Sequence, residues 1–432
     1  MNHTAEVYLW GTRIGIIHQD EGKSFASFEY DADFLKSGIE LSPVRMPLSN
    51  VIYEFPMLSG APFYGLPGLV ADSLPDDFGN RVIEQWLAGQ GRSIRDFTAI
   101  DRLCYTGERG MGALEYVPAS TEIKDIDEDI NVAEMVRFAS DVLNHRKSVT
   151  LNAEEQLTYS QLVQVGSSAG GARAKALIAW NESTHEIKSG QLSLEPGFDY
   201  WLMKFDNVSK NGDHGLEDKP EYTLIEYAYY KMALACGIEM NECRIYHAGN
   251  EHHFMTKRFD RADGEKIHMQ SLGALAHISY KEPALCSYEL AAQYMREIGL
   301  SMPEIEQFYR RMVFNCAAVN QDDHVKNVSF LMDRTGEWRL APAYDITFSY
   351  NPDNKWLRAH QMLINHKSKN ITAEDLLAAG KVMGLKTRKC KEIINEISST
   401  VGHIEEFAAE AGIREETVHN MKVILDQNKI EL

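Results

Sequence analysis

The sequence predicts an α+β protein with a β-rich first half and a helical second half. Two observations lead to this prediction. Short apolar stretches separated by Gly, Asp and Asn turn signals recur up to about residue 258, a pattern typical of strands. After about residue 260 the apolar residues instead repeat with the spacing of helices. With 432 residues, the chain is long enough for two or three domains with a large buried core.

Most of the predicted strands lie in the first half. We expect strands at 7–10, 14–17, 24–28, 175–180, 200–205, 243–246 and 254–257. A helix is expected up to Leu87, and either Asp76 or Asp77 can cap its first turn. A Gly-rich, strand-like stretch follows at 107–117. A charged connector at 119–150 contains a helix at 132–144, and a further helix at 224–235 stops before a glycine.

The second half is predicted to be mainly helical, because its apolar residues recur every three or four positions. The expected helices are 287–298, 303–319, 373–383, 390–407 and 415–426. Between the second and third of these lies a polar stretch followed by a short strand-and-turn pattern, which becomes important below. The chain contains no internal repeat and no low-complexity segment.

Composition restricts the classes of function. The net charge of -19 argues against a protein that itself grips a nucleic-acid backbone, since such proteins cluster Lys and Arg. The six cysteines are scattered and contain no C-x-x-C pair, as expected for reduced thiols rather than disulfides or a zinc site. The first residues do not resemble a signal peptide, and no apolar run has membrane-spanning length. We therefore expect a cytoplasmic protein without a membrane partner.

The polar stretch in the second half carries the strongest functional signal. Asp322 and Asn327 have the D-x-x-x-x-N spacing of a protein-kinase catalytic loop, and Asp345 follows on the strand-and-turn stretch. Phosphoryl transfer needs a carboxylate near the attacking hydroxyl. It also needs an amide oxygen and a second carboxylate to hold Mg²⁺ against a triphosphate. These residues supply all three groups. Asp323 is adjacent to Asp322, so the identity of the base is open by one residue.

A run of small residues at 166–175 precedes a predicted strand. Small residues let the backbone approach a ligand and direct N–H groups at phosphate oxygens. The run lacks the Gly-Lys-Ser/Thr of a Walker A loop, and taken alone it fits a flexible surface turn equally well. It also matches G-x-S-x-G, with Ser168 as the nucleophile of a serine hydrolase. That motif requires a helix after it, whereas the sequence predicts a strand.

Further candidates extend this pattern, although each has an ordinary structural explanation. Lys204 lies inside an apolar strand, where it would need an anionic partner if it is buried; an edge lysine facing water is the alternative. Glu226 lies near the start of a helix and could orient Lys204, or it could simply be solvated. His324 and Lys326 share a turn with Asn327, which could be a solvated loop. The order Gly-rich run, strand lysine, helix glutamate, D-x-x-x-x-N and aspartate is that of kinase parts, so the series predicts phosphoryl transfer.

The residues that carry this series resemble the HipA family of toxin serine/threonine kinases. The similar stretches span most of the chain: 107–114, 168–175, 257–261, 322–327 and 340–345. The resemblance implies a bilobal, protein-kinase-like fold that encloses ATP between an α+β front half and an all-helical back half. It divides the chain into a β-rich subdomain at 1–120, an α+β lobe with the Gly-rich segment at 121–258, and a helical lobe at 259–432.

The resemblance also implies roles for individual residues. Asp322 would be the catalytic aspartate, and Asn327 and Asp345 the Mg²⁺ ligands. Ser168, or Ser167 beside it, would be autophosphorylated, which switches off the kinase by adding charge beside the triphosphate. The residues expected around ATP are Gly170, Gly171, Ala172, Arg173, Ala174, Lys175, Lys204, Glu226, Lys257, Arg258, Phe259, His324, Lys326, Asn327, Tyr344 and Asp345.

Members of this family typically act with a small helix-turn-helix antitoxin, HipB, so the resemblance implies a HipB-like partner, expected as a dimer, that contacts operator DNA. The acidic chain would reach DNA mainly through that partner. The implied activity is phosphorylation of a protein substrate; the best-known family substrate is glutamyl-tRNA synthetase, and substrates differ between members. Two alternatives stay open. One is a serine hydrolase that uses Ser168. The other is an inactive scaffold, against which the presence of Asp322, Asn327 and Asp345 counts.

Overall fold

The computed structural model describes residues 2–89, 91–120, 129–143, 162, 173–191, 196–206, 208, 221–262 and 264–432. The chain forms two compact units that interleave along the sequence. The first unit comprises residues 1–39, 48–223 and 242–269, and the second comprises residues 40–47, 224–241 and 270–432. The chain thus passes between the units repeatedly. The division into three domains with boundaries at 120 and 258 remains a prediction.

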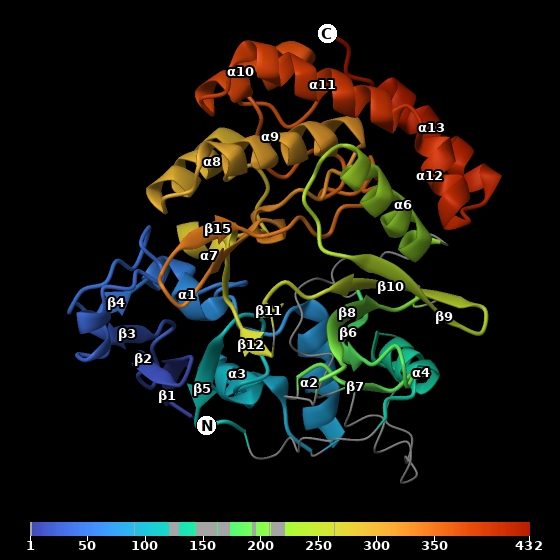
Figure 1. Cartoon of the computed structure of the whole chain (residues 1–432). Coiled ribbons are helices and arrows are strands. Elements are labelled where there is room, and N and C mark those ends of the chain that lie inside the picture. Colours follow the sequence, from blue (N-terminus) through green and yellow to red (C-terminus); the bar gives the residue numbers. More distant parts are fainter. Residues whose placement is uncertain are drawn as a thin grey trace. The chain divides into compact units, whose positions relative to one another are not determined.

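The first unit begins with an antiparallel sheet of strand order β4-β3-β2-β1-β5 (Figure 1). Its strands are β1 (Thr4–Leu9), β2 (Thr12–His18), β3 (Ser27–Tyr30), β4 (Tyr53–Glu54) and β5 (Leu114–Val117). The strand predicted at 24–28 begins later than expected. Residue Ala26 donates its backbone N–H to Gly65 instead of a neighbouring strand, and Phe28 and Tyr30 supply the buried positions of β3.

The second sheet of this unit has the order β7-β6-β8-β10-β9, and its pairings are antiparallel. The strands of this part of the chain are β6 (Lys175–Trp180), β7 (Ile187–Ser189), β8 (Asp199–Lys204), β9 (Cys243–Ala248), β10 (Glu251–Lys257), β11 (Arg261–Ala262), β12 (Glu265–Lys266) and β13 (His268–Ser271), the last of which ends in the second unit. Lys204 is paired with Lys175 on one side and Phe254 on the other, so all three side chains lie on one face of the sheet.

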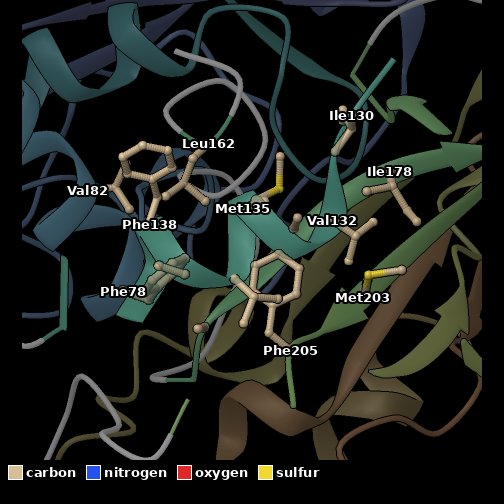
Figure 2. Packing of buried hydrophobic residues seen from close by; sticks show 14 of the residues in the cluster. Phe78, Val82, Ile130, Val132, Met135, Phe138, Leu162, Ile178, Met203 and Phe205 are labelled. Atoms are coloured by element: carbon tan, nitrogen blue, oxygen red, sulfur yellow. The ribbon is translucent and has the colours of Figure 1, made fainter. Parts of the chain in front are cut away.

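The opposite face of this sheet packs on two helices, as Figure 2 shows. Trp201, Met203 and Phe205 alternate along β8 and contribute to this buried cluster. The helices of the first unit are α1 (Gly68–Ala71), α2 (Asp77–Gly89), α3 (Ala99–Thr106) and α4 (Val132–Leu143), with short 3₁₀ turns η1 (Phe34–Ser37), η2 (Pro56–Leu58) and η3 (Ile94–Asp96). Phe78 and Val82 of α2 face the sheet together with residues of α4.

The second unit is built mainly of helices. Its elements are α6 (Tyr222–Ala235), whose first residues belong to the first unit, α7 (Leu272–Ala276), α8 (Tyr288–Glu297), α9 (Met302–Ala317), η4 (Val325–Asn327), β14 (Ser329–Met332), β15 (Trp338–Leu340), α10 (Ala373–Val382), α11 (Thr387–Val401), α12 (Ile404–Ala411) and α13 (Glu415–Gln427). Helix α9 contacts α8 on one side and α11 on another (Figure 1). Gly380 lets α10 approach closely, because a Cβ there would lie 2.5 Å from Sγ of Cys390.

Two local predictions need correction, and one helix was missed. The helix predicted at 390–407 is two helices, since α11 ends at Val401 and α12 starts at Ile404. Gly402 lies at the break and ends the hydrogen bonding of α11. The second half also contains the short strands β14 and β15, which an all-helical description omits. Helix α3 was not predicted, although a capping box formed by Thr98 and Asp101 starts it. None of the described helices combines the length and apolarity needed to cross a bilayer.

Asp375 at the start of α10 provides a test of acid stability. Burial raises the pKa of Asp375, but hydrogen bonds from Lys367 and from the backbone of Thr372 outweigh this effect and lower the pKa from 3.8 to about 2. Because the folded-state pKa is the lower one, the contribution of Asp375 to stability is present above pH 3.8 and decreases as the pH falls towards 2.

We therefore expect Asp375→Asn to lower the free energy of unfolding by about 1–3 kcal/mol near neutral pH. The difference from the unchanged chain should shrink on acidification to about pH 3 and below. Urea unfolding at both pH values measures this difference. A destabilisation that is independent of pH would contradict the assignment, because it would show that the charge of Asp375 makes no contribution.

Candidate active site

The loop that connects α9 to β14 carries the D-x-x-x-x-N motif. Its backbone is fixed at Gln321, whose N–H donates to the carbonyl oxygen of Ser349, and by a parallel bridge between Asn320 and Ser349. Val319 adopts a left-handed φ of 52° where the chain leaves α9. This turn ends the helix and directs the following polar residues into the loop. The sequence correctly predicted the end of α9 near this point.

The two adjacent aspartates of the loop have different environments. The side chain of Asp322 is 43% exposed, and its Oδ1 lies 3.9 Å from Nε2 of His324. The side chain of Asp323 is fully buried. A carboxylate that takes a proton from a substrate hydroxyl must be within reach of that substrate. The sequence left open whether Asp322 or Asp323 is the base. The exposure of Asp322 favours Asp322.

Asp323 instead accepts hydrogen bonds within the second unit. Its carboxylate accepts from the hydroxyl of Tyr288 at 2.8 Å, from Nδ1 of His360 at 2.9 Å and from the backbone N–H of Gln361 at 2.7 Å. Burial alone lowers the pKa of His360, but the negative charge of Asp323 overcomes this effect and raises the pKa well above its ordinary value. The two side chains therefore form a buried ion pair.

Asn327 has one half of its amide engaged within the loop. Its Nδ2 donates to the backbone carbonyl of Asp322 at 2.9 Å, which fixes the side chain and leaves Oδ1 as the free end of the amide. Asp345 follows β15 and adopts a left-handed φ of 53°. Both residues line one pocket of the second unit, together with His324 and Tyr344. The pocket thus brings together a residue with an amide oxygen and a residue with a carboxylate, and both groups are ligand types that Mg²⁺ prefers.

The other predicted residues of the loop have identifiable contacts. Lys326 places its ammonium group 5.3 Å from the ring centre of Tyr280, and that ring also lies 5.3 Å from the ring of His324. The hydroxyl of Tyr344 donates to the backbone carbonyl of Lys326 at 2.7 Å and lies near Ser329. Tyr344 therefore joins the stretch that contains Asp345 to the loop that carries the D-x-x-x-x-N motif. Nδ1 of His324 is buried and has no hydrogen-bond partner in the described part of the chain.

In the first unit, Lys175 and Lys204 begin and end paired strands, and both are buried. The Nζ of Lys175 forms an ion pair of 2.9 Å with Oδ2 of Asp76, and both side chains are at most 2% exposed. The Oδ1 of Asp76 accepts the N–H of Gly79, so the same carboxylate caps α2 as predicted. Burial of Lys204 excludes the alternative of a strand-edge lysine that faces water. Its Nζ lies 5.9 Å from the ring centre of Phe254.

The Asp76–Lys175 pair allows a stability prediction. We expect Asp76→Asn to lower the free energy of unfolding by about 3 kcal/mol, because it removes a buried carboxylate from a buried ammonium group. Asparagine can still cap α2, so the loss reports the ion pair. Urea unfolding measures it. A double variant, Asp76→Asn with Lys175→Met, should recover much of the loss, and a double variant as unstable as the single one would contradict the assignment.

The predicted hinge residues follow β10. Lys257 pairs with Asp199 at 2.7 Å, and Phe259 is partly buried. Arg258 is buried and donates to both carboxylate oxygens of Asp260 at 2.9 and 2.8 Å. Burial raises the pKa of Asp260, but the adjacent guanidinium groups dominate and hold the pKa well below its ordinary range. The side chain of Arg258 therefore has a structural partner within the first unit, and a contact of this segment with a nucleotide stays a prediction.

The remaining predicted residues differ in their burial and in whether the structure describes them. Glu226 lies in the first turns of α6 and is only 2% exposed, which excludes a solvated helix glutamate. Glu226 belongs to the second unit and Lys204 to the first, so their pairing stays a prediction. Arg173 lies 4.7 Å from the ring centre of Tyr222. Ala174 is buried in the cluster of Figure 2. The residues that lie outside the described part of the chain are Ser167, Ser168, Gly170, Gly171 and Ala172.

The sequence did not predict the partners of the buried carboxylates. Tyr288 and His360 are separated from Asp323 by 35 and 37 positions, and no local spacing relates them. The only available signal was the doubled aspartate, since two adjacent carboxylates seldom face the same environment. Among the described residues, no group of three or more His, Cys, Asp or Glu side chains could hold a metal ion. The proposed ligand pair differs from such a group, because Asn327 contributes an amide oxygen.

Comparison with protein families decides what kind of chain carries this site. A family model described as the HipA-like C-terminal domain matches residues 167–404. This match covers more than half of the chain. The chain belongs to the HipA family. The HipA N-terminal domain model also matches, at residues 5–117.

Two further comparisons concern the fold and a curated relative. Over its whole length the chain is similar to HipA of Shewanella oneidensis MR-1, which was solved in a complex with HipB and its operator DNA. The TM-score is 0.65 at 16% identity, covering 98% of this chain and 95% of that one. This likeness confirms the predicted α+β fold class. A Haemophilus influenzae protein named "Putative kinase" is 26% identical over 159 residues. That match spans 33% of this chain and 46% of the relative, less than half its length.

Proposed function

We propose that this HipA-family chain is an ATP-dependent serine/threonine protein kinase and the toxin of a toxin–antitoxin pair. The loop geometry is the observation that carries the proposal. The side chain of Asp322 is 43% exposed, whereas the amide of Asn327 donates to the backbone carbonyl of Asp322, and Asn327 lines the same pocket as Asp345. A general base and two oxygen ligands for Mg²⁺ are the groups that phosphoryl transfer needs. The kinase name of the Haemophilus relative agrees with this reading.

The proposed reaction uses few groups of the protein. The hydroxyl oxygen of a serine or threonine forms a bond to the γ-phosphorus of ATP, and the bond from that phosphorus to its bridging oxygen breaks. ADP leaves with the bond electrons. The hydroxyl proton passes to the carboxylate of Asp322, which orients the hydroxyl before the transfer. The phosphorylated side chain and ADP are the products.

Asn327 and Asp345 would hold Mg²⁺. The donor set fits this ion, because Mg²⁺ takes oxygen ligands and completes its shell with water and phosphate oxygens. When bound, the ion neutralises part of the triphosphate charge. Tyr344 supports the pair by tying the segment of Asp345 to the backbone of Lys326. The left-handed backbone of Asp345 sets the direction in which its carboxylate leaves the chain.

The nucleotide would contact two further sets of residues. Lys204 is the proposed ligand of the α- and β-phosphates, with Glu226 as its orienting partner, because both side chains are buried and an anion stabilises a buried ammonium group. The Gly-rich segment would surround the phosphates. The adenine side would meet the backbone at 257–259. The proposed phosphate-loop and loop-turn residues are Gly170, Gly171, Ala172, Arg173, Ala174, Lys175, His324 and Lys326.

Incubation with Mg-ATP tests the proposal directly. We expect intact-mass measurement to show one added phosphate, and peptide mapping to place it within 166–175, at Ser168 or Ser167. The same incubation of Asp322→Asn should add little phosphate in the same time. A chain that gains no phosphate and shows no thermal shift with Mg-ATP is not a kinase of this type.

The serine-hydrolase alternative makes an opposite prediction. It requires labelling of Ser168 by a fluorophosphonate without ATP. The strand β6 (Lys175–Trp180) follows the Gly-rich run where a nucleophile elbow requires a helix, which favours the kinase. An inactive scaffold would bind partners but add no phosphate in the experiment above.

The proposed partner is a HipB-like helix-turn-helix antitoxin. The relative from Shewanella was solved with HipB and operator DNA, and the charge of -19 makes direct binding of this chain to DNA weak. We expect a helix-turn-helix protein encoded beside this chain to bind it in size-exclusion chromatography. We also expect the chain to shift operator DNA in a gel only when that protein is present. DNA binding by the chain alone would contradict this arrangement. The protein substrate in the cell is part of the same proposal and differs between family members.

A further inference from the structure

A continuous hydrogen-bonded network lies beneath the candidate catalytic loop. The Nδ2 of Asn320 donates to Oδ1 of Asn315 at 3.0 Å, and Nδ2 of Asn315 donates to the hydroxyl of Tyr288 at 2.9 Å. That hydroxyl donates in turn to Asp323 at 2.8 Å. The successive hydrogen bonds thus all donate in one direction, towards the carboxylate of Asp323. The network begins and ends on the loop itself, at Asn320 and Asp323.

Asp322 lies between the two loop residues that this network holds. Asn320 is two positions before it and Asp323 directly after it, and both side chains are buried. Asn315 and Tyr288 belong to α9 and α8, which carry the core of the second unit. The backbone of Asp322 is therefore fastened on both sides to rigid helices. A residue that must meet a substrate hydroxyl within hydrogen-bond distance needs this kind of support.

Asp323 also connects the loop to a later segment of the chain. Beyond Tyr288, it accepts hydrogen bonds from His360 and from the backbone of Gln361, at the end of the stretch 346–361 that follows Asp345. The groups that face His360 are Asp323 and Cys316. The side chain of Asp323 is 0% exposed and that of His360 is 5% exposed. A carboxylate buried so completely requires a neutralising cation, and the imidazolium of His360 supplies it.

We infer that Asp323 is a positioning residue for phosphoryl transfer, and that with His360 it fastens the loop bearing Asp322 and Asn327 to the stretch 346–361. This inference rests on the proposed function. Many kinases order the segment after the metal aspartate through a phosphate that pairs with arginine. In this chain the carboxylate of Asp323 and the imidazolium of His360 supply the two opposite charges. The end of the stretch 346–361 is therefore held without added phosphate.

The test compares Asp323→Asn and His360→Gln with a matched variant, Asp375→Asn. Asp375 is also a buried carboxylate that pairs with a cation and accepts backbone hydrogen bonds, but it caps α10 and does not contact the loop. We expect kcat for phosphate addition to fall about 10- to 100-fold in the first two variants, with a smaller change in the KM for ATP. Asp375→Asn should lose stability but keep its kcat.

Hydrogen exchange gives a readout that is independent of activity. We expect the backbone amides at 320–328 to exchange faster in Asp323→Asn and His360→Gln than in the unchanged chain, and not in Asp375→Asn. The double variant Asp323→Asn with His360→Gln should lose no more activity than the worse single variant, because the two residues act as one unit. His360→Gln keeps the test valid if Asp323→Asn does not fold.

The outcomes separate this inference from the proposed function. If the unchanged chain adds no phosphate, the proposed function fails, and exchange at 320–328 still decides whether Asp323 anchors the loop. If the unchanged chain is active and Asp323→Asn keeps the kcat of Asp375→Asn, the inference is overturned. A lower kcat with unchanged exchange at 320–328 also overturns it, since the residue would then act in another way.

Discussion

Asp322→Asn is expected to lower the rate of phosphate addition by about 10²- to 10⁴-fold, the range that a positioned general base contributes. The substitution keeps the size of the side chain but removes the group that accepts the hydroxyl proton. The backbone carbonyl of Asp322 can still accept from Asn327, so the loop should keep its shape. Single-turnover phosphate transfer, followed by mass spectrometry, measures the rate constant.

The control for Asp322→Asn is the same change at an exposed aspartate of the second unit. Asp426 of α13 is exposed and lies outside the stretch 346–361, and Asp426→Asn should leave the rate unchanged. Nucleotide binding by Asp322→Asn should also persist, as seen from its thermal shift with Mg-ATP, because the phosphate and metal ligands are intact. A variant that retains more than about a tenth of the rate would show that Asp322 is not the base.

Asp345→Asn is the second large effect that we expect, a loss of about 10²-fold in rate with a shift of the Mg²⁺ midpoint to higher concentration. The change removes the only charged oxygen of the proposed Asn327–Asp345 pair, and a neutral amide binds Mg²⁺ less well than a carboxylate. Asparagine tolerates the left-handed φ of 53° at this position, so the backbone should not change. Titration of activity with Mg²⁺ should show partial recovery at high concentration.

The matching control is Asp333→Asn, which alters a carboxylate that Thr335 already satisfies in a surface turn of the same unit. That variant should keep the Mg²⁺ dependence of the unchanged chain. If Asp345→Asn has the same Mg²⁺ midpoint and the same rate as Asp333→Asn, Asp345 does not bind the ion. Alanine at position 345 would be a poorer choice, because it adds backbone strain to the loss of the ligand.

Local patterns predicted the elements that carry the site. Strands β6 and β8 were found because their apolar runs are flanked by turn signals, and α8, α9 and α10 because their apolar residues repeat at helical spacing. The boundary between α11 and α12 was missed, since the apolar pattern continues past Gly402. The strand β3 was displaced because pairing with β2, rather than composition, decides where it starts.

The chemistry of neighbouring residues was harder to predict than the elements. The sequence placed Asp322 and Asp323 side by side and could not rank them, because burial depends on contacts with distant residues such as Tyr288. The same limit hid the partner of Lys175, since Asp76 lies almost a hundred positions earlier in the chain. Spacing within a motif can be read locally, whereas the charge environment of a residue depends on the fold.

The interleaving of the two units has a consequence for synthesis on the ribosome. The sheet β7-β6-β8-β10-β9 belongs to the first unit, yet β9 and β10 are translated after α6, which lies largely in the second unit. The first unit therefore cannot complete its sheet until residue 257 has emerged, with the edge of β8 unpaired until then. Such an exposed edge is a site for mispairing during translation.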